Sequence, residues 1–121
     1  MEAKITRLPA DMAHVIRHAA GAALPDIRAE IEKGSAELYR FDDCFFCFRI
    51  EQYQQHKEFV VVAAEGREVA KHCRAIVKKA SEMGCECVRF HTSSEKLGRA
   101  MRRFGAVEAE RVYKVATNGR Q

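Results

Sequence analysis

The chain has 121 residues, 47% hydrophobic and 31% charged, which indicates a single soluble globular domain over residues 1–121 and excludes a disordered chain. Lys and Arg number 21 against 17 Asp and Glu, and the resulting charge of +4 is low for a dedicated nucleic-acid-binding domain. No apolar run approaches the roughly 20 residues that a membrane-spanning helix needs, and no signal-peptide pattern is present. We expect the five cysteines to be reduced thiols, and therefore a cytoplasmic location.

The first half of the chain predicts a strand, two helices and a β-hairpin. Pro25 suits the first turn of the second helix, and Gly34 suits its end. Asp42-Asp43 is the expected turn of the hairpin. In chain order, the expected elements are a strand at 4–8, helices at 9–21 and 25–34, and strands at 37–41 and 44–53.

The second half predicts a strand–helix–strand unit. The unbroken apolar run at 59–64 is typical of a strand buried on both faces. From Arg67 to Met83 the apolar residues repeat with helical spacing, and Gly84 suits a left-handed cap. A strand at 85–91, a helix after an N-cap at 92–94 and a strand at 110–116 complete the chain. The expected fold is α/β (α+β), with a mixed, mostly antiparallel sheet and one parallel strand–helix–strand crossover.

These elements and residues resemble the GNAT superfamily of acetyl-CoA-dependent N-acyltransferases. The resemblance is carried by FVVVAA at 59–64, GCECVRFHT at 84–92, a helix ending RRFG at 102–105, and VYKV at 112–115. The segment LPDIRAEIEKGSAELYRF at 24–41, followed by a hairpin, is similar to short GNAT-like proteins of tailed bacteriophages. A phage origin would imply the host cytoplasm as the location.

The resemblance implies transfer of an acyl group from acetyl-CoA or another acyl-CoA to a small-molecule or protein amine. His91, at the end of a parallel strand, and Glu51 are the candidate general bases. An ordinary polar residue at a strand end is at least as typical for His91, and an exposed sheet edge is more typical for Glu51. The strand backbone would orient the pantetheine arm, and the turn after it would hold the pyrophosphate. The implied cofactor-binding residues are Val61, Val62, Ala63, Gly66, Arg67, Val69, Ala70 and Lys71.

The departures from the family pattern fall at the cofactor turn and in the last helix. The family's loop, Q/R-x-x-G-x-G/A, falls on Ala64, Arg67 and Val69, while Gly66 is out of phase. Arg67 and Lys71 would then supply charge where the family uses backbone N–H groups. Met101 stands where the family often has a tyrosine. The alternative is therefore a catalytically inactive GNAT-fold binding or assembly protein, with a phage or host protein or nucleic acid as its partner.

Two further patterns have ordinary structural explanations. Cys44 and Cys47 lie three apart in a predicted strand and so point to opposite faces, which argues against a zinc site built from them and from Cys85-x-Cys87. We predict no metal site from the sequence. The basic residues of the 67–83 helix are typical of a solvated face, so nucleic acid is not the expected partner, whereas a homodimer is allowed.

Overall fold

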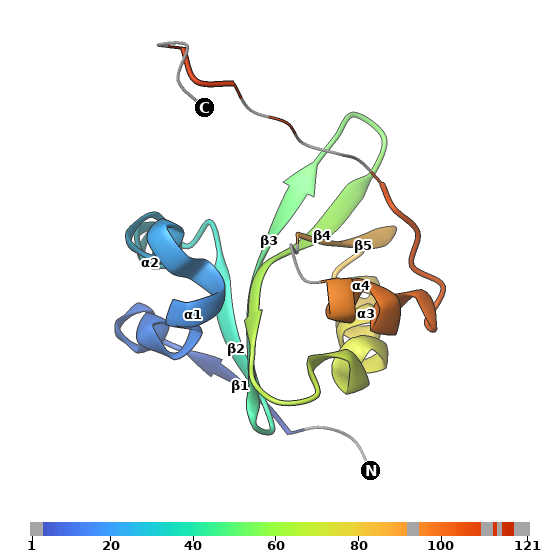
Figure 1. Ribbon diagram of the computed structural model, residues 1–121, viewed down its shortest axis with the longest axis horizontal. Helices are drawn as coiled ribbons and strands as arrows, with labels where there is room; N and C mark the ends of the chain where they lie inside the picture. Colours follow the sequence, from blue (N-terminus) through green and yellow to red (C-terminus); the bar gives the residue numbers. More distant parts are fainter. Residues whose placement is uncertain (1–3, 92–94, 110–112, 114, 118–121) are drawn as a thin grey trace.

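A computed structural model describes residues 4–91, 95–109, 113 and 115–117 (Figure 1). These residues form a five-stranded sheet with the order β1-β2-β3-β4-β5. Neighbouring strands are antiparallel except for β4 and β5, which are parallel. The predicted mixed sheet with one parallel crossover is therefore confirmed. The strands are β1 (Ile5–Leu8), β2 (Glu37–Phe41), β3 (Cys44–Gln52), β4 (Lys57–Glu65) and β5 (Cys87–Phe90).

Helices cover both faces of the sheet. Figure 1 shows α1 and α2 on one side, and α3 and α4 on the other. None of the helices in the described part of the chain is long and apolar enough to cross a bilayer. The α-helices are α1 (Arg17–Ala20), α2 (Leu24–Lys33), α3 (Cys73–Glu82) and α4 (Glu95–Arg102), and the 3-10 helices are η1 (Ala10–Ile16), η2 (Gly21–Ala23) and η3 (Val69–His72).

Two apolar clusters hold these layers together, one on each face of the sheet. Four phenylalanines dominate the cluster beneath α3, where Phe48 stacks on Phe59 with ring centroids 4.1 Å apart. The cluster on the opposite face joins Ile16 of η1 and Ile27 of α2 to Leu38 and Cys47 of the sheet. The sheet is thus buried on both sides, as the apolar run in β4 predicts.

The crossover helix begins later than the sequence pattern predicts. The predicted start is Arg67, but the α-helix begins at Cys73, after a 3-10 turn. Glu68 adopts a left-handed conformation with φ 46°, which interrupts any helix through it. The buried face of the helix is as predicted, since Cys73, Ile76 and Ala80 are buried. The predicted left-handed cap at Gly84 is confirmed by its φ of 80°.

The last part of the chain differs from the sequence prediction. Phe104, which the helical spacing places on the buried stripe of the last helix, is 43% exposed. The expected last strand at 110–116 is not formed by its described residues, 113, 115 and 116; its other positions lie outside the described residues. The expected N-cap at 92–94 also lies outside them.

Candidate cofactor and active site

A β-bulge in β4 shapes the candidate site. Phe48 of β3 pairs with Val61 and Cys47 pairs with Ala63, so Val62 is an extra residue without a partner on β3. Such a bulge twists the strand and re-aims its side chains. Here Val61 packs under α3, whereas Val62 and Ala63 both pack on the α2 side. The bulge lies at the point where β4 leaves its other neighbour.

The parallel strands β4 and β5 separate at the bulge. Their last pair is Val61 with Phe90, and the His91 N–H donates to the Val61 carbonyl at 3.3 Å. β4 continues to Glu65, and no strand among the described residues runs along this edge beyond Val61. Backbone groups in this part of β4 are therefore available to a ligand that lies alongside the strand.

The separation opens onto a cavity of about 930 Å³, within the range of small-molecule sites. Seven of the ten residues predicted for the site line it, and Glu51, Arg67 and Lys71 do not. Residues of α1 and α4 complete the walls. The predicted lining residues are Val61, Val62, Ala63, Gly66, Val69, Ala70 and His91, and those that sequence reasoning missed are His18, Ala19, Ala64, Glu68, Phe90, Lys96, Leu97 and Ala100.

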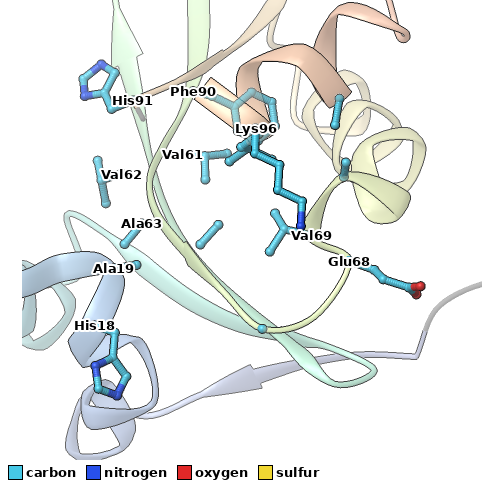
Figure 2. Close-up of a pocket in the computed structure, with 15 residues that line it drawn as sticks. His18, Ala19, Val61, Val62, Ala63, Glu68, Val69, Phe90, His91 and Lys96 are labelled. Carbon is cyan, nitrogen blue, oxygen red and sulfur yellow. The ribbon is translucent and has the colours of Figure 1, made fainter. Parts of the chain in front are cut away.

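The cavity wraps around the free edge of β4. Figure 2 shows His91, Val62 and Ala63 along one side of the strand, with Phe90 and Val69 along the other. This arrangement follows from the bulge and from the early end of β5. An extended chain entering between the strands would therefore meet the backbone of β4 and an apolar wall on each side.

The turn after β4 holds two residues of unusual conformation. Gly66 has φ 138°, and a Cβ on it would lie 2.8 Å from the Cα of Cys44 and 2.9 Å from the carbonyl oxygen of Asp43. Only glycine fits here, because backbone crowds it and the φ is unfavourable for other residues. Glu68, two positions later, has φ 46°. The turn thus keeps two left-handed positions two residues apart, with glutamate at the second.

Glu65 joins the end of β4 to the first helical layer. Its Oε1 accepts hydrogen bonds from the backbone N–H groups of His18 and Ala19, both at 2.9 Å. This double contact fixes α1 beside the cavity, where His18 and Ala19 form part of its wall. No sequence pattern links residues so far apart in the chain, so sequence reasoning did not find them.

The charged groups at the cavity differ from those that the sequence suggests. Lys96 of α4 lines it and extends toward Val69 in Figure 2, whereas the Glu68 carboxylate points away from the cavity. Lys71 pairs with Glu68 instead, with Nζ 3.1 Å from Oε2. Arg67 contributes its carbonyl to the Cys44 thiol at 2.7 Å. Lys96 is therefore the lysine that lines the cavity among the described residues.

Glu51 lies away from the cavity, and the structure does not bring it together with His91. It pairs with Arg49 at 2.9 Å and accepts a hydrogen bond from the Tyr53 hydroxyl at 2.7 Å. The Tyr53 hydroxyl and, next, Arg49 hold the pKa of Glu51 below its ordinary value. A carboxylate with a lowered pKa is a weaker base than an ordinary glutamate. Of the two candidate bases, His91 lines the cavity and Glu51 does not.

Comparison with solved structures shows the GNAT acetyltransferase fold over nearly the whole chain. An acetyltransferase from Trypanosoma brucei matches with a TM-score of 0.66 at 12% identity, covering 95% of this chain and 99% of that one. Glucosamine-6-phosphate N-acetyltransferase from Arabidopsis thaliana matches with a TM-score of 0.64 at 10% identity, covering 97% of this chain and 99% of that one. Ribosomal-protein-alanine N-acetyltransferase from Brucella melitensis matches with a TM-score of 0.63 at 15% identity, covering 93% of this chain and 98% of that one. No protein-family model and no curated protein sequence matches the chain.

Proposed function

We propose that the protein is an N-acyltransferase that moves an acetyl or other acyl group from acyl-CoA to an amine. The observation that carries the proposal is the separation of β4 from β5 onto a cavity of about 930 Å³. The acetyltransferase fold agrees with it, but a fold alone does not establish an activity. Any activity therefore depends on the residues at the opening.

The acyl-CoA would lie along the free edge of β4. Its pantetheine amides would pair with the backbone of Val61, Val62 and Ala63, much as a peptide adds a strand to a sheet. Its pyrophosphate would meet the turn formed by Gly66, Val69 and Ala70. Because Arg67 and Lys71 do not line the cavity, the positive charge at the phosphates would come from Lys96.

The acyl transfer needs a base at the mouth of the cavity. The amine nitrogen attacks the thioester carbonyl, the new N–C bond forms, and the C–S bond breaks to release the CoA thiolate. His91 would accept the proton that the amine loses. His91 lies just after the last β4–β5 pair, lines the cavity and is exposed to solvent.

Cofactor binding is tested by blocking the cavity from α1. Ala19 lines it, whereas the exposed Ala22 in η2 does not, so Ala19→Trp and Ala22→Trp form a matched pair. In calorimetric titrations with acetyl-CoA, we expect wild type and Ala22→Trp to bind alike, and Ala19→Trp to bind at least about tenfold more weakly. Equal binding by all three would place acetyl-CoA elsewhere, and no binding near millimolar would remove the proposal.

The catalytic role of His91 is tested by release of the CoA thiol over a panel of primary amines and amine-bearing peptides. We expect His91→Ala to lower kcat by about 10²–10⁴ and to leave KM for acetyl-CoA nearly unchanged. The limb of the pH profile that reports protonation of the base should disappear in the variant. A His91→Ala variant with wild-type kcat and pH profile would exclude His91 as the base.

One observation favours a second candidate, a GNAT-fold binding protein without activity. Glu68 lines the cavity beside the turn where the pyrophosphate would lie, and it places a negative charge, paired with Lys71, near the phosphates. In that case wild type would not bind acetyl-CoA and Glu68→Gly would. The phage origin, a host or virion protein partner, and a homodimer stay predictions.

A further inference from the structure

Three metal-binding side chains meet where the β2–β3 hairpin touches the turn after β4. Asp43 and Cys44 come from the hairpin, and His72 ends η3. A carboxylate oxygen, the Cys44 Sγ and a ring nitrogen of His72 all lie within 4.8 Å of one another. Cys47 takes no part, because it lies in the apolar cluster on the other face of the sheet. This trio therefore differs from the cysteine pairs that the sequence suggests.

His72 has a buried nitrogen that the protein leaves unsatisfied. The residue is 3% exposed, and its Nε2 has no hydrogen-bond partner in the part of the chain that the structure describes. The ring packs edge-on against Phe41 and Phe46, with centroids 6.0 and 6.1 Å away. A buried polar atom without a partner is costly, and a metal ion would satisfy it. Burial first, and Lys71 next, lower the pKa of His72.

Cys44 is a fully buried thiol that already points to polar atoms. Its Sγ donates to the Arg67 carbonyl at 2.7 Å and lies 3.5 Å from Asp43 Oδ1. Burial, followed by Asp43, raises its pKa to about 11, so the thiol keeps its proton when no metal is bound. A coordinated metal ion would displace that proton to solvent. The resulting thiolate and the Asp43 carboxylate would together balance a divalent charge.

We propose that Asp43, Cys44 and His72 form a zinc site with one position left for water. Sulfur, nitrogen and carboxylate donors together suit Zn²⁺, whereas Mg²⁺ and Ca²⁺ prefer oxygen alone. Zinc bonds of about 2.0–2.3 Å place ligand atoms roughly 3.5 Å apart. The three ligand atoms, now within 4.8 Å of one another, must therefore move closer together by about 1 Å. Asp43 is exposed and has room for that movement.

The proposed ion would fasten the hairpin to the turn that lines the cavity. The two segments are already in close contact at Gly66 and Cys44. Zinc would link Cys44 of the hairpin to His72 at the end of η3 by binding both side chains. Its effect would be to hold residues 66–69 in place. The proposal does not depend on the acyltransferase function.

Cobalt provides a direct spectroscopic test, because Co²⁺ occupies zinc sites and absorbs strongly when bound to thiolate. The apo protein would be titrated with CoCl₂ and the cobalt then displaced with ZnCl₂. We expect one equivalent of Co²⁺ to produce a thiolate-to-cobalt band and the spectrum of a tetrahedral ion, and Zn²⁺ to abolish both. Absence of the band with millimolar Co²⁺, together with no Zn²⁺ binding by calorimetry, would overturn the proposal.

Matched variants identify the ligands. Cys44→Ala should lose the band, whereas Cys47→Ala, a buried cysteine on the opposite face, should keep it. Asp43→Asn is exposed and should fold normally while weakening Zn²⁺ binding at least tenfold. His72→Leu removes the unsatisfied nitrogen, so it should keep its thermal stability without metal but lose the rise in Tm that Zn²⁺ gives wild type. A band that survives in Cys44→Ala, or a Zn²⁺-induced rise in Tm that survives in His72→Leu, would contradict the assignment.

Discussion

Replacing Gly66 with alanine should disturb the turn that forms the floor of the cavity. The added Cβ would lie 2.8 Å from the Cα of Cys44, 2.9 Å from the carbonyl oxygen of Asp43, and 2.9 Å from the Cys44 Sγ. Two of these atoms are backbone, so no rotamer change can move them away. The φ of 138° is itself unfavourable for alanine.

The size of the effect follows from these two causes. An unfavourable backbone conformation costs about 1–3 kcal/mol, and backbone overlap adds to it. We expect Gly66→Ala to lower the free energy of unfolding by about 2–4 kcal/mol, a large share of a typical stability of about 5–15 kcal/mol. For a domain of this size, that corresponds to a fall in Tm of roughly 10 °C.

Substitutions at two other glycines, measured by the same thermal unfolding, separate the cost of the backbone conformation from the cost of the overlap with neighbouring backbone. Gly34 has φ 83°, and a Cβ added there would meet nothing within 4 Å, so Gly34→Ala should show only the conformational cost, about 1 kcal/mol. Gly98 lies inside α4 with open space around it, so Gly98→Ala should stabilise the protein by about 0.5–1 kcal/mol. A Gly66→Ala variant that melts within about 2 °C of wild type would refute the close contact between the turn and the hairpin.

Three further predictions concern residues around the same turn and sheet. Glu68→Gly should raise the free energy of unfolding by about 0.5–1 kcal/mol, because glycine accepts the left-handed conformation. Glu68→Gln, the control for charge, should leave it unchanged. Equal melting temperatures for the two variants would contradict this prediction. Glu65→Ala removes the acceptor of two backbone N–H bonds, from His18 and Ala19, and should cost about 1–3 kcal/mol in urea unfolding and speed amide exchange at both residues; unchanged exchange there would refute the contact. Burial raises the pKa of Cys47 from 9.0 to about 12, so the native state holds this proton more tightly than the unfolded chain. That stabilisation is complete below about pH 9 and is lost as the pH rises toward 12. The urea concentration at the unfolding midpoint should therefore be lower at about pH 10.5 than at about pH 8. In Cys47→Ala the difference between the two pH values should be smaller.

The strands were predictable because their signals are local. Alternating apolar residues and turn residues mark the hairpin, and β2 begins and ends at the predicted residues, Glu37 and Phe41. Gly34 and Gly84 mark helix ends through their left-handed conformation, as expected. The buried face of the crossover helix follows from its spacing alone. The architecture and the position of the parallel crossover therefore follow from the sequence.

The details that decide the site were not predictable in the same way. The bulge at Val62 lies inside an unbroken apolar run, where no periodicity exists to be broken. The late start of the helix depends on Glu68, and glutamate carries no signal for a left-handed conformation. Lys96 reaches the cavity from a helix that is distant in the sequence, through tertiary packing. These features arise from contacts between elements, which a linear pattern does not record.

The most direct test of the central claim is the backbone amide NMR spectrum of the protein during titration with acetyl-CoA. If the cofactor lies along the free edge of β4, the largest shift changes should fall on Val62, Ala63 and Gly66, with a further change at His91, and they should saturate at one equivalent. Changes confined to the exposed basic face of α3, or no saturable change near millimolar acetyl-CoA, would contradict the account.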